Sequence, residues 1–138
     1  REGQTASTVA SELLSPVAFE RQLAIERART ERSRFIFTMV AFSVESAENE
    51  VDQARAERAL CAVLSERTRI CDTKGWLGKR LAVILPYTTV AGARGLVQTL
   101  DTLFHEQYEE SSQTRTTGAS LSCSIYEYPA DRIEQVTG

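Results

Sequence analysis

The fold of this chain is decided by one stretch, Arg69-Ile-Cys-Asp-Thr-Lys-Gly-Trp-Leu-Gly-Lys-Arg-Leu-Ala-Val-Ile-Leu-Pro86. Residues 81–85 are an unbroken apolar run that ends at a proline. Because proline cannot donate to a sheet ladder, this run predicts a buried strand with a fixed end. Residues 69–73 are of mixed polarity, which predicts a less buried strand. Gly75 and Gly78 lie between the two segments and indicate a tight connection, so we predict a β-hairpin with its tip at these glycines.

Two more strands are predicted, one on each side of this hairpin. Residues 35–43 are apolar at both alternating sets of positions, which is typical of a central strand covered on both faces. Residues 121–125 alternate apolar with polar side chains, as in a strand covered on one face only.

Three helices complete the pattern. The first covers residues 15–33 and has a proline in its first turn, where proline is favoured. The second carries one apolar stripe and ends near Arg67. The third follows a cap at Thr88 or Thr89.

The third helix and the loop after it contain residues that weaken regular structure. Gly92 and Gly95 lower the stability of the helix, and we expect them to let its backbone approach the sheet. Residues 109–118 are a polar stretch without a core-forming side chain, which predicts a mobile loop.

The order of these elements, a helix followed by βαββαβ, predicts an α+β ferredoxin-like sandwich. In this fold the strand order is 4-1-3-2, so the first and third strands must be central and the other two must be edges. The continuous apolar runs at 35–43 and 80–85 agree with that requirement. We predict a single domain over residues 15–130, preceded by a flexible lead-in over residues 1–14 and followed by a tail over residues 131–138.

Composition limits the classes of function. The chain has 138 residues, of which 42% are hydrophobic and 25% charged, as in a globular domain with a proper core. The net charge of −3 predicts neither nucleic-acid binding nor attraction to a membrane surface. No apolar run approaches the roughly 20 residues that span a bilayer. We see no signal peptide. We therefore expect no direct membrane insertion and a cytoplasmic location, which includes the cytoplasmic part of a membrane protein. Since the chain begins at Arg1 rather than Met, we expect it to be part of a longer protein.

The cysteines and the histidine give no catalytic or metal site. Cys61, Cys71 and Cys123 have no Cys-x-x-Cys spacing and lie in apolar or strand-like contexts, which predicts buried free thiols in a reducing compartment. His105 is the only histidine, and its place late in an amphipathic helix, near solvent, argues against a catalytic triad.

Four segments, in order along the chain, resemble the GGDEF domain of diguanylate cyclases. They are Phe19 in the first helix, Arg69-x-x-Asp72, Leu81–Pro86 and Leu121–Ile125. The resemblance covers about Leu13 to Tyr128 and implies the nucleotide-cyclase-like form of the ferredoxin fold. In that family, acidic residues hold Mg²⁺ against the phosphates of the nucleotide.

The active-site positions implied by this resemblance are not acidic here. The signature Gly-Gly-Asp/Glu-Glu-Phe falls on Leu77-Gly78-Lys79-Arg80-Leu81, so two cations replace two acids. The metal-binding Asp-x-Asp of the first strand falls on Ala41-Phe42-Ser43. Lys79 and Arg80 would repel a metal ion, so we expect no metal, no cofactor and no catalytic residue in this domain.

The first interpretation is therefore a catalytically inactive regulatory or scaffolding domain that acts on other domains of its parent protein. The segment Gly75-Trp76-Leu77 also resembles the degenerate GGDEF-like region that precedes some bacterial sugar transferases. Those are membrane enzymes of exopolysaccharide biosynthesis that load a sugar phosphate onto polyprenyl phosphate. This narrower resemblance implies that the parent is such a transferase.

Two alternatives stay open. In the GGDEF family the Arg-x-x-Asp motif forms an inhibitory product site, so Arg69 and Asp72 are candidate ligands of cyclic-di-GMP. The competing interpretation is that Arg69 only pairs with Asp72 or with an acid on a helix. Trp76 and Leu77 at a hairpin tip would predict a homodimer interface, unless Trp76 folds back over the core.

Overall fold

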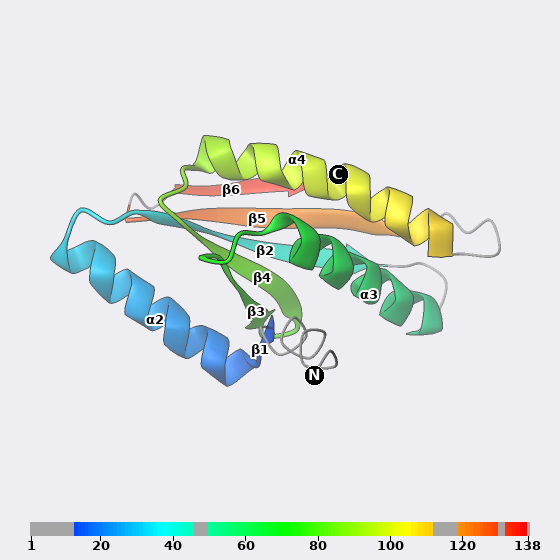
Figure 1. Ribbon diagram of the computed structural model, residues 1–138, viewed down its shortest axis with the longest axis horizontal. Helices are drawn as coiled ribbons and strands as arrows, with labels where there is room; N and C mark the ends of the chain where they lie inside the picture. The colour runs from blue at the N-terminus through cyan, green and yellow to red at the C-terminus, as the bar shows by residue number, and fades with distance from the viewer. Residues whose placement is uncertain (1–12, 46–49, 112–118, 130–131, 138) are drawn as a thin grey trace.

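The computed structural model describes residues 13–45, 50–111, 119–129 and 132–137 (Figure 1). The elements are β1 (Leu13–Leu14), α2 (Pro16–Arg32), β2 (Phe37–Glu45), α3 (Glu50–Arg67), β3 (Thr73–Leu77), β4 (Arg80–Pro86), α4 (Val90–Ser111), β5 (Ser120–Tyr128) and β6 (Arg132–Thr137). All three predicted helices are present. Of the predicted mobile loop, residues 109–111 belong to α4 and residues 112–118 lie outside the described residues.

The strands form one six-stranded sheet in the order β1-β3-β4-β2-β5-β6. Its four inner strands, β3-β4-β2-β5, have the predicted 4-1-3-2 order and pair antiparallel, which confirms the ferredoxin-like prediction. The prediction that the second and fourth strands are edges is wrong. Short β1 pairs in parallel with β3, and β6 pairs antiparallel with β5. Residues 132–137, expected to be a tail, therefore extend the sheet.

Helices cover both faces of this sheet (Figure 1). α3 and α4 lie side by side on one face, where their apolar side chains join those of β2, β4 and β5 in the larger core cluster. α2 lies on the other face, where Phe19 and Leu23 pack in a smaller cluster with Phe37 and Ile84. The first six residues of β2 are all buried, as expected for a central strand between two layers.

The predicted hairpin is present, but its first strand lies later in the chain than residues 69–73. Arg69 to Asp72 form a turn, in which the Asp72 N–H donates to the Arg69 carbonyl oxygen at 3.0 Å. The strand that follows is β3, and the two residues Gly78 and Lys79 connect it to β4. Gly78 has φ of 66°, a left-handed conformation that glycine adopts without strain and that tight hairpin turns require.

Gly75 lies inside β3 rather than at the hairpin tip. A Cβ atom there would lie 2.7 Å from Phe19 Cδ1 and 2.9 Å from the Leu14 carbonyl oxygen, so only glycine allows β1 and α2 to approach so closely. The expectation that Gly92 and Gly95 bring α4 close to the sheet is wrong. A Cβ atom at Gly92 would meet only Thr88 and Thr89 within 4 Å, and one at Gly95 would meet nothing within that distance.

Polar side chains fix the starts of two helices. Ser15 Oγ accepts a hydrogen bond from the Ala18 N–H at 3.3 Å, which caps α2. Thr89 Oγ1 accepts from the Gly92 N–H at 3.3 Å, so the second of the two predicted caps is the one used for α4. Among the described residues, no helix has the length and apolarity needed to cross a membrane.

Candidate functional site

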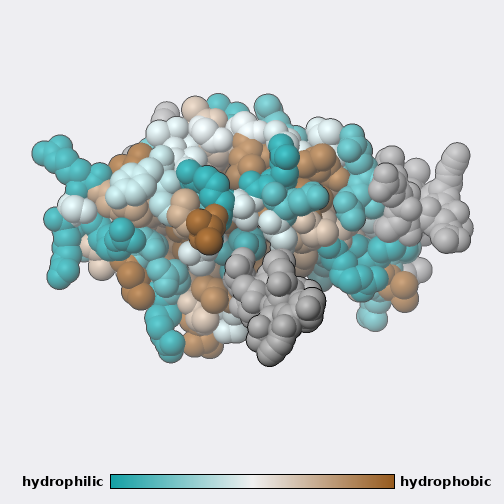
Figure 2. Space-filling view, in the orientation of Figure 1, coloured by the Kyte–Doolittle hydropathy of each residue, from teal (hydrophilic) through white to brown (hydrophobic). Residues whose placement is uncertain are grey.

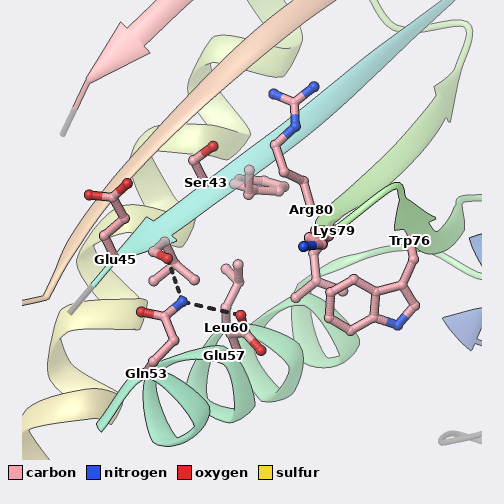
Figure 3. A pocket seen from close by; sticks show the side chains of 11 residues that line it. Ser43, Glu45, Gln53, Glu57, Leu60, Trp76, Lys79 and Arg80 are labelled. Atoms are coloured by element: carbon pink, nitrogen blue, oxygen red, sulfur yellow. Dashed lines mark hydrogen bonds between the residues drawn. The ribbon is translucent and has the colours of Figure 1, made fainter. Parts of the chain in front are cut away.

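A cleft of about 380 Å³ opens where the end of β2, the start of α3 and the hairpin meet (Figure 3). We call it the hairpin cleft. Its polar lining consists of Ser43, Glu45, Gln53, Glu57, Lys79 and Arg80. Trp76, Leu60 and Phe42 supply apolar walls. In the close-up, Gln53 and Glu57 project from α3 below β2, whereas Ser43, Glu45 and Arg80 lie on the other side of that strand.

The signature positions predicted from the sequence lie at the edge of this cleft. Gly78 and Lys79 form the turn between β3 and β4, Arg80 begins β4, and Leu81 is buried in the larger core. Neither the Lys79 nor the Arg80 side chain forms a hydrogen bond or an ion pair with any of the described residues. Two cations therefore stand at the cleft without a counter-charge bound to them.

The two β2 positions that are predicted to have lost metal-binding acids differ in their surroundings. Ala41 is fully buried and pairs with Ala82 on β4 and Ser124 on β5. A charged side chain at Ala41 would be enclosed in the smaller apolar cluster, where an unpaired charge is strongly disfavoured. Ser43 lies two residues later, where β2 reaches the cleft.

Two carboxylates in the cleft were not identified as site residues from the sequence. Glu45 ends β2 and is exposed, and Glu57 on α3 accepts a hydrogen bond from Gln53 Nε2 at 3.1 Å. Gln53 Nε2 also donates to the Val44 carbonyl oxygen at 2.7 Å and so joins α3 to β2. A spacing of four residues between Gln53 and Glu57 on a predicted helix was the only signal available for this contact.

The cleft is a poor match for a divalent metal. Mg²⁺ requires several oxygen ligands in near-octahedral geometry, and the cleft adds two cations close to its two carboxylates. Within the described residues, no group of three or more His, Cys, Asp or Glu side chains is arranged to hold an ion.

Trp76 and Leu77 lie in β3 and not at the hairpin tip. Trp76 is partly buried and packs against the larger core cluster, so it folds back over the core. Leu77 is also partly buried and packs against the smaller cluster on the other face of the sheet. The observation that motivated a homodimer interface at these two residues, an exposed apolar tip, is therefore absent.

Arg69 and Asp72 are brought together by the turn before β3. Asp72 Oδ2 accepts from the Arg69 backbone N–H at 2.7 Å, and Asp72 Oδ1 accepts from Arg69 Nη2 at 3.1 Å. The carboxylate side chain is 2% exposed, whereas the Arg69 side chain is 59% exposed. The hydrogen bond and the charge interaction between the Arg69 guanidinium group and Asp72 raise the pKa of Arg69. In the structure, Arg69 therefore pairs with Asp72, as in the competing interpretation given above.

A second cavity, of about 240 Å³, lies beside this ion pair. We call it the Arg69 pocket. Arg67 and Arg69 supply two guanidinium groups, Thr88 supplies a hydroxyl, and Leu85 and Leu96 supply apolar surface. The Arg67 side chain forms no hydrogen bond or ion pair with the described residues. The pocket can offer two cations to an anionic ligand without breaking the backbone hydrogen bond at Asp72.

The thiols and the histidine take no part in either cavity. All three cysteines are free, as predicted, but Cys71 is exposed because it lies in the turn and not in a strand. Burial raises the pKa of Cys123 to about 11, so this thiol is inert at neutral pH. His105 lies on α4, as predicted, with Nδ1 at 2.9 Å from the Asp101 carbonyl oxygen.

Comparison with solved structures places this fold among GGDEF domains. The GGDEF domain of DgcB from Caulobacter crescentus, in complex with c-di-GMP, has 13% sequence identity and a TM-score of 0.68 over 87% of this chain and 73% of that one. A DGC protein from Thermotoga maritima has 17% identity and a TM-score of 0.62 over 86% and 84% of the two chains. The diguanylate cyclase SiaD from Pseudomonas aeruginosa, in complex with its activator SiaC, has 16% identity and a TM-score of 0.60 over 87% and 48%. No protein-family model matches the sequence, and a search of curated proteins finds no relative. At these identities the likeness establishes the fold and not the activity.

Proposed function

We propose that this chain is a catalytically inactive domain with the diguanylate cyclase fold, which regulates or scaffolds other parts of its parent protein. One observation carries the proposal. The hairpin turn that corresponds to the signature has kept its left-handed glycine, Gly78, but presents Lys79 and Arg80 where a metal-dependent cyclase requires acids. A hairpin that carries two cations at these positions supports an inactive domain.

Electrostatics explains why such a hairpin does not support nucleotide cyclisation. Phosphoryl transfer of this kind depends on metal ions that neutralise charge on the phosphates and on a group that activates the attacking hydroxyl. Lys79 and Arg80 can attract phosphate, but they oppose the binding of a divalent cation beside it. A carboxylate at the buried Ala41 would lack the solvation or counter-charge that it needs.

Catalytic inactivity is tested by incubating the purified chain with GTP and either Mg²⁺ or Mn²⁺ and separating the products by liquid chromatography. We expect no cyclic dinucleotide. The double variant Lys79→Asp/Arg80→Glu restores the acidic signature alone, and we expect it to remain inactive because Ala41 and Ser43 are unchanged. Product from the unmodified chain would overturn the proposal.

The regulatory role is tested in the parent protein. Deleting the domain is expected to change the regulation or assembly of the parent protein, while the catalytic region of the parent should remain active. The proposal that the parent is a bacterial polyprenyl-phosphate sugar transferase rests on Gly75-Trp76-Leu77 alone. Sequencing the surrounding gene tests it, and a reading frame without a sugar transferase region would contradict it.

We propose cyclic-di-GMP binding as a second candidate function, at the Arg69 pocket. The supporting observation is that Arg67 and the exposed part of Arg69 face one cavity beside apolar surface, which suits a ligand with phosphates and flat bases. The opposing observation is that Asp72 is already fully engaged by Arg69. A ligand would therefore meet the two arginines rather than the carboxylate.

Isothermal titration with cyclic-di-GMP decides this second candidate. We expect a dissociation constant below about 100 μM, which corresponds to about −5.5 kcal/mol or stronger. Arg69→Ala is expected to abolish the heat, and Lys79→Ala at the other end of β3 is the matched control that should retain it. Absence of heat with the unmodified chain would remove this function and leave the first proposal intact.

A further inference from the structure

The outer face of α4 carries a third cavity, beside the end of α3. It has a volume of about 400 Å³ and is lined by Arg67 and by five residues of α4 from Gly95 to Leu103. It shares Arg67 with the Arg69 pocket, which reaches Gly92 and Leu96 on the same helix. The two cavities together follow α4 from Gly92 to Leu103, and we call this surface the α4 groove. In Figure 2, pale and brown side chains gather over α4, whereas the end of α2 is predominantly teal.

Gly95 is the feature of this groove that the fold does not explain. It lies inside a 22-residue helix, where glycine is less favourable than alanine. A Cβ atom at this position would meet nothing within 4 Å, so no neighbouring element of the domain requires its absence. At Gly75, by contrast, the missing Cβ is needed by α2 and β1. An element from outside the domain would benefit from the flat backbone at Gly95.

The chemistry of the groove indicates the kind of element that fits. Leu96 and Leu103 are partly buried and pack against the larger core, so their outer surfaces give the groove an apolar floor. Thr99 lies between them and is also only partly buried. Arg67 stands at the junction of the two cavities and has no ion-pair partner among the described residues. Eleven residues of helix separate Gly92 from Leu103, a length of about 16 Å or three helical turns.

We propose that the α4 groove docks an acidic amphipathic helix of another domain of the parent protein, an inference that rests on the proposed regulatory function. The apolar face of this helix would lie on Leu96 and Leu103 and cross α4 at Gly95, where the two backbones can approach closely. An acidic side chain on its flank would pair with Arg67, and charge complementarity at this residue selects an acidic helix over a basic one. This site lies outside the hairpin cleft, and it gives a regulatory domain a surface through which to act.

Two synthetic peptides of about 14 residues test the proposal with the whole chain. Both carry leucines at i, i+4, i+7 and i+11; one has glutamates on the flanks and its twin has lysines. Fluorescence anisotropy of the labelled peptides is expected to show binding of the glutamate peptide that is at least about tenfold tighter than that of the lysine peptide. Equal affinities, or no binding of either peptide, would overturn the proposal.

Variants separate docking from stability. Gly95→Ala is expected to raise the melting temperature, since alanine favours helix and meets no neighbour, while Gly95→Leu is expected to weaken peptide binding about tenfold or more. Ala24→Leu on the exposed face of α2 is the matched control and should leave binding unchanged. Unchanged affinity of Gly95→Leu would contradict the proposal.

Arg67→Glu gives the sharpest result, because it should make the lysine peptide the better ligand of the two. Peptide anisotropy and cyclic-di-GMP calorimetry are separate measurements on the same chain, so failure of this inference can be distinguished from failure of the cyclic-di-GMP proposal. If gel filtration shows a dimer that Gly95→Leu dissociates, and neither peptide binds, a second copy of this chain occupies the groove and the proposal is wrong.

Discussion

The two turns that flank β3 both carry cations, but they hold them in different ways. Before the strand, Arg69 donates to Asp72, whose buried carboxylate also accepts the backbone N–H of the turn. After the strand, Lys79 lies in the turn with Gly78 and Arg80 begins β4, and neither side chain has a hydrogen-bond or ion-pair partner among the described residues. The first cation is part of the hydrogen bonding that forms the turn. The side chains of the second pair make no hydrogen bond or ion pair within the described residues, so we expect their charges to contribute little to stability.

The largest loss of stability is expected for Asp72→Ala. This change removes the acceptor of the Arg69 backbone N–H and the partner of its guanidinium group at once, and we expect a loss of about 3 kcal/mol in the free energy of unfolding. Chemical denaturation followed by circular dichroism measures it. Asp72→Asn keeps one acceptor oxygen and should lose less. A loss below about 0.5 kcal/mol would show that the first turn does not depend on its ion pair.

Gly75→Ala tests the strand between the two turns. The new Cβ would lie within 3 Å of Phe19 and of the Leu14 backbone, so either α2 or β1 must move. We expect a loss of about 2 kcal/mol, typical of overpacking at a tight contact. Gly95→Ala is the control and is expected to increase the free energy of unfolding, measured by the same denaturation experiment. Equal effects of the two substitutions would contradict the assignment of Gly75 to close packing.

Gly78→Ala examines the second turn alone. No atom lies within 4 Å of the added Cβ, so the cost is the left-handed backbone conformation by itself, about 1 kcal/mol. Gly78→Asn should cost less, since asparagine tolerates this conformation better. A loss as large as that of Gly75→Ala would mean that the tip is packed more tightly than its open surroundings indicate.

The smallest effect is expected at the cations of the second turn. Lys79→Ala combined with Arg80→Ala should change the free energy of unfolding by no more than about 0.5 kcal/mol, because Lys79 is exposed, Arg80 is half-buried and neither side chain has a partner among the described residues. The same denaturation experiment is the measurement. A destabilisation above about 1 kcal/mol would show that the second turn, like the first, depends on its cations for stability.

The hydrophobic periodicity of the sequence was sufficient to predict the central strands of the sheet. The runs at 35–43 and 81–85 identified the two central strands because strands buried on both faces are apolar throughout. It was insufficient for the edges, since β1 has only two residues and the two apolar residues of β6, Ile133 and Val136, are three apart and do not alternate. The first strand of the hairpin was misplaced for a related reason. Gly75 looked like a turn residue, although its role is close packing against Phe19.

The candidate site was predictable only where backbone geometry follows from residue type. Gly78 was placed correctly in the turn, and the Arg69–Asp72 pairing was among the alternatives considered. Glu57 was not identified because its place in the cleft depends on how α3 packs against β2, and this packing is a tertiary property. The exposed position predicted for Trp76 was wrong for the same reason, since a strand that starts four residues later moves the indole onto the core, and the homodimer interface stays an untested prediction.

The position of Trp76 has a practical consequence. It is the only tryptophan of the chain and forms one wall of the hairpin cleft, between the core and the open space. Excited where tyrosine does not absorb, the intrinsic emission comes from this one side chain, which borders both the cleft and the core. Whatever enters the cleft would displace water from the indole and shift that emission, so the domain carries its own unlabelled optical probe for screening ligands.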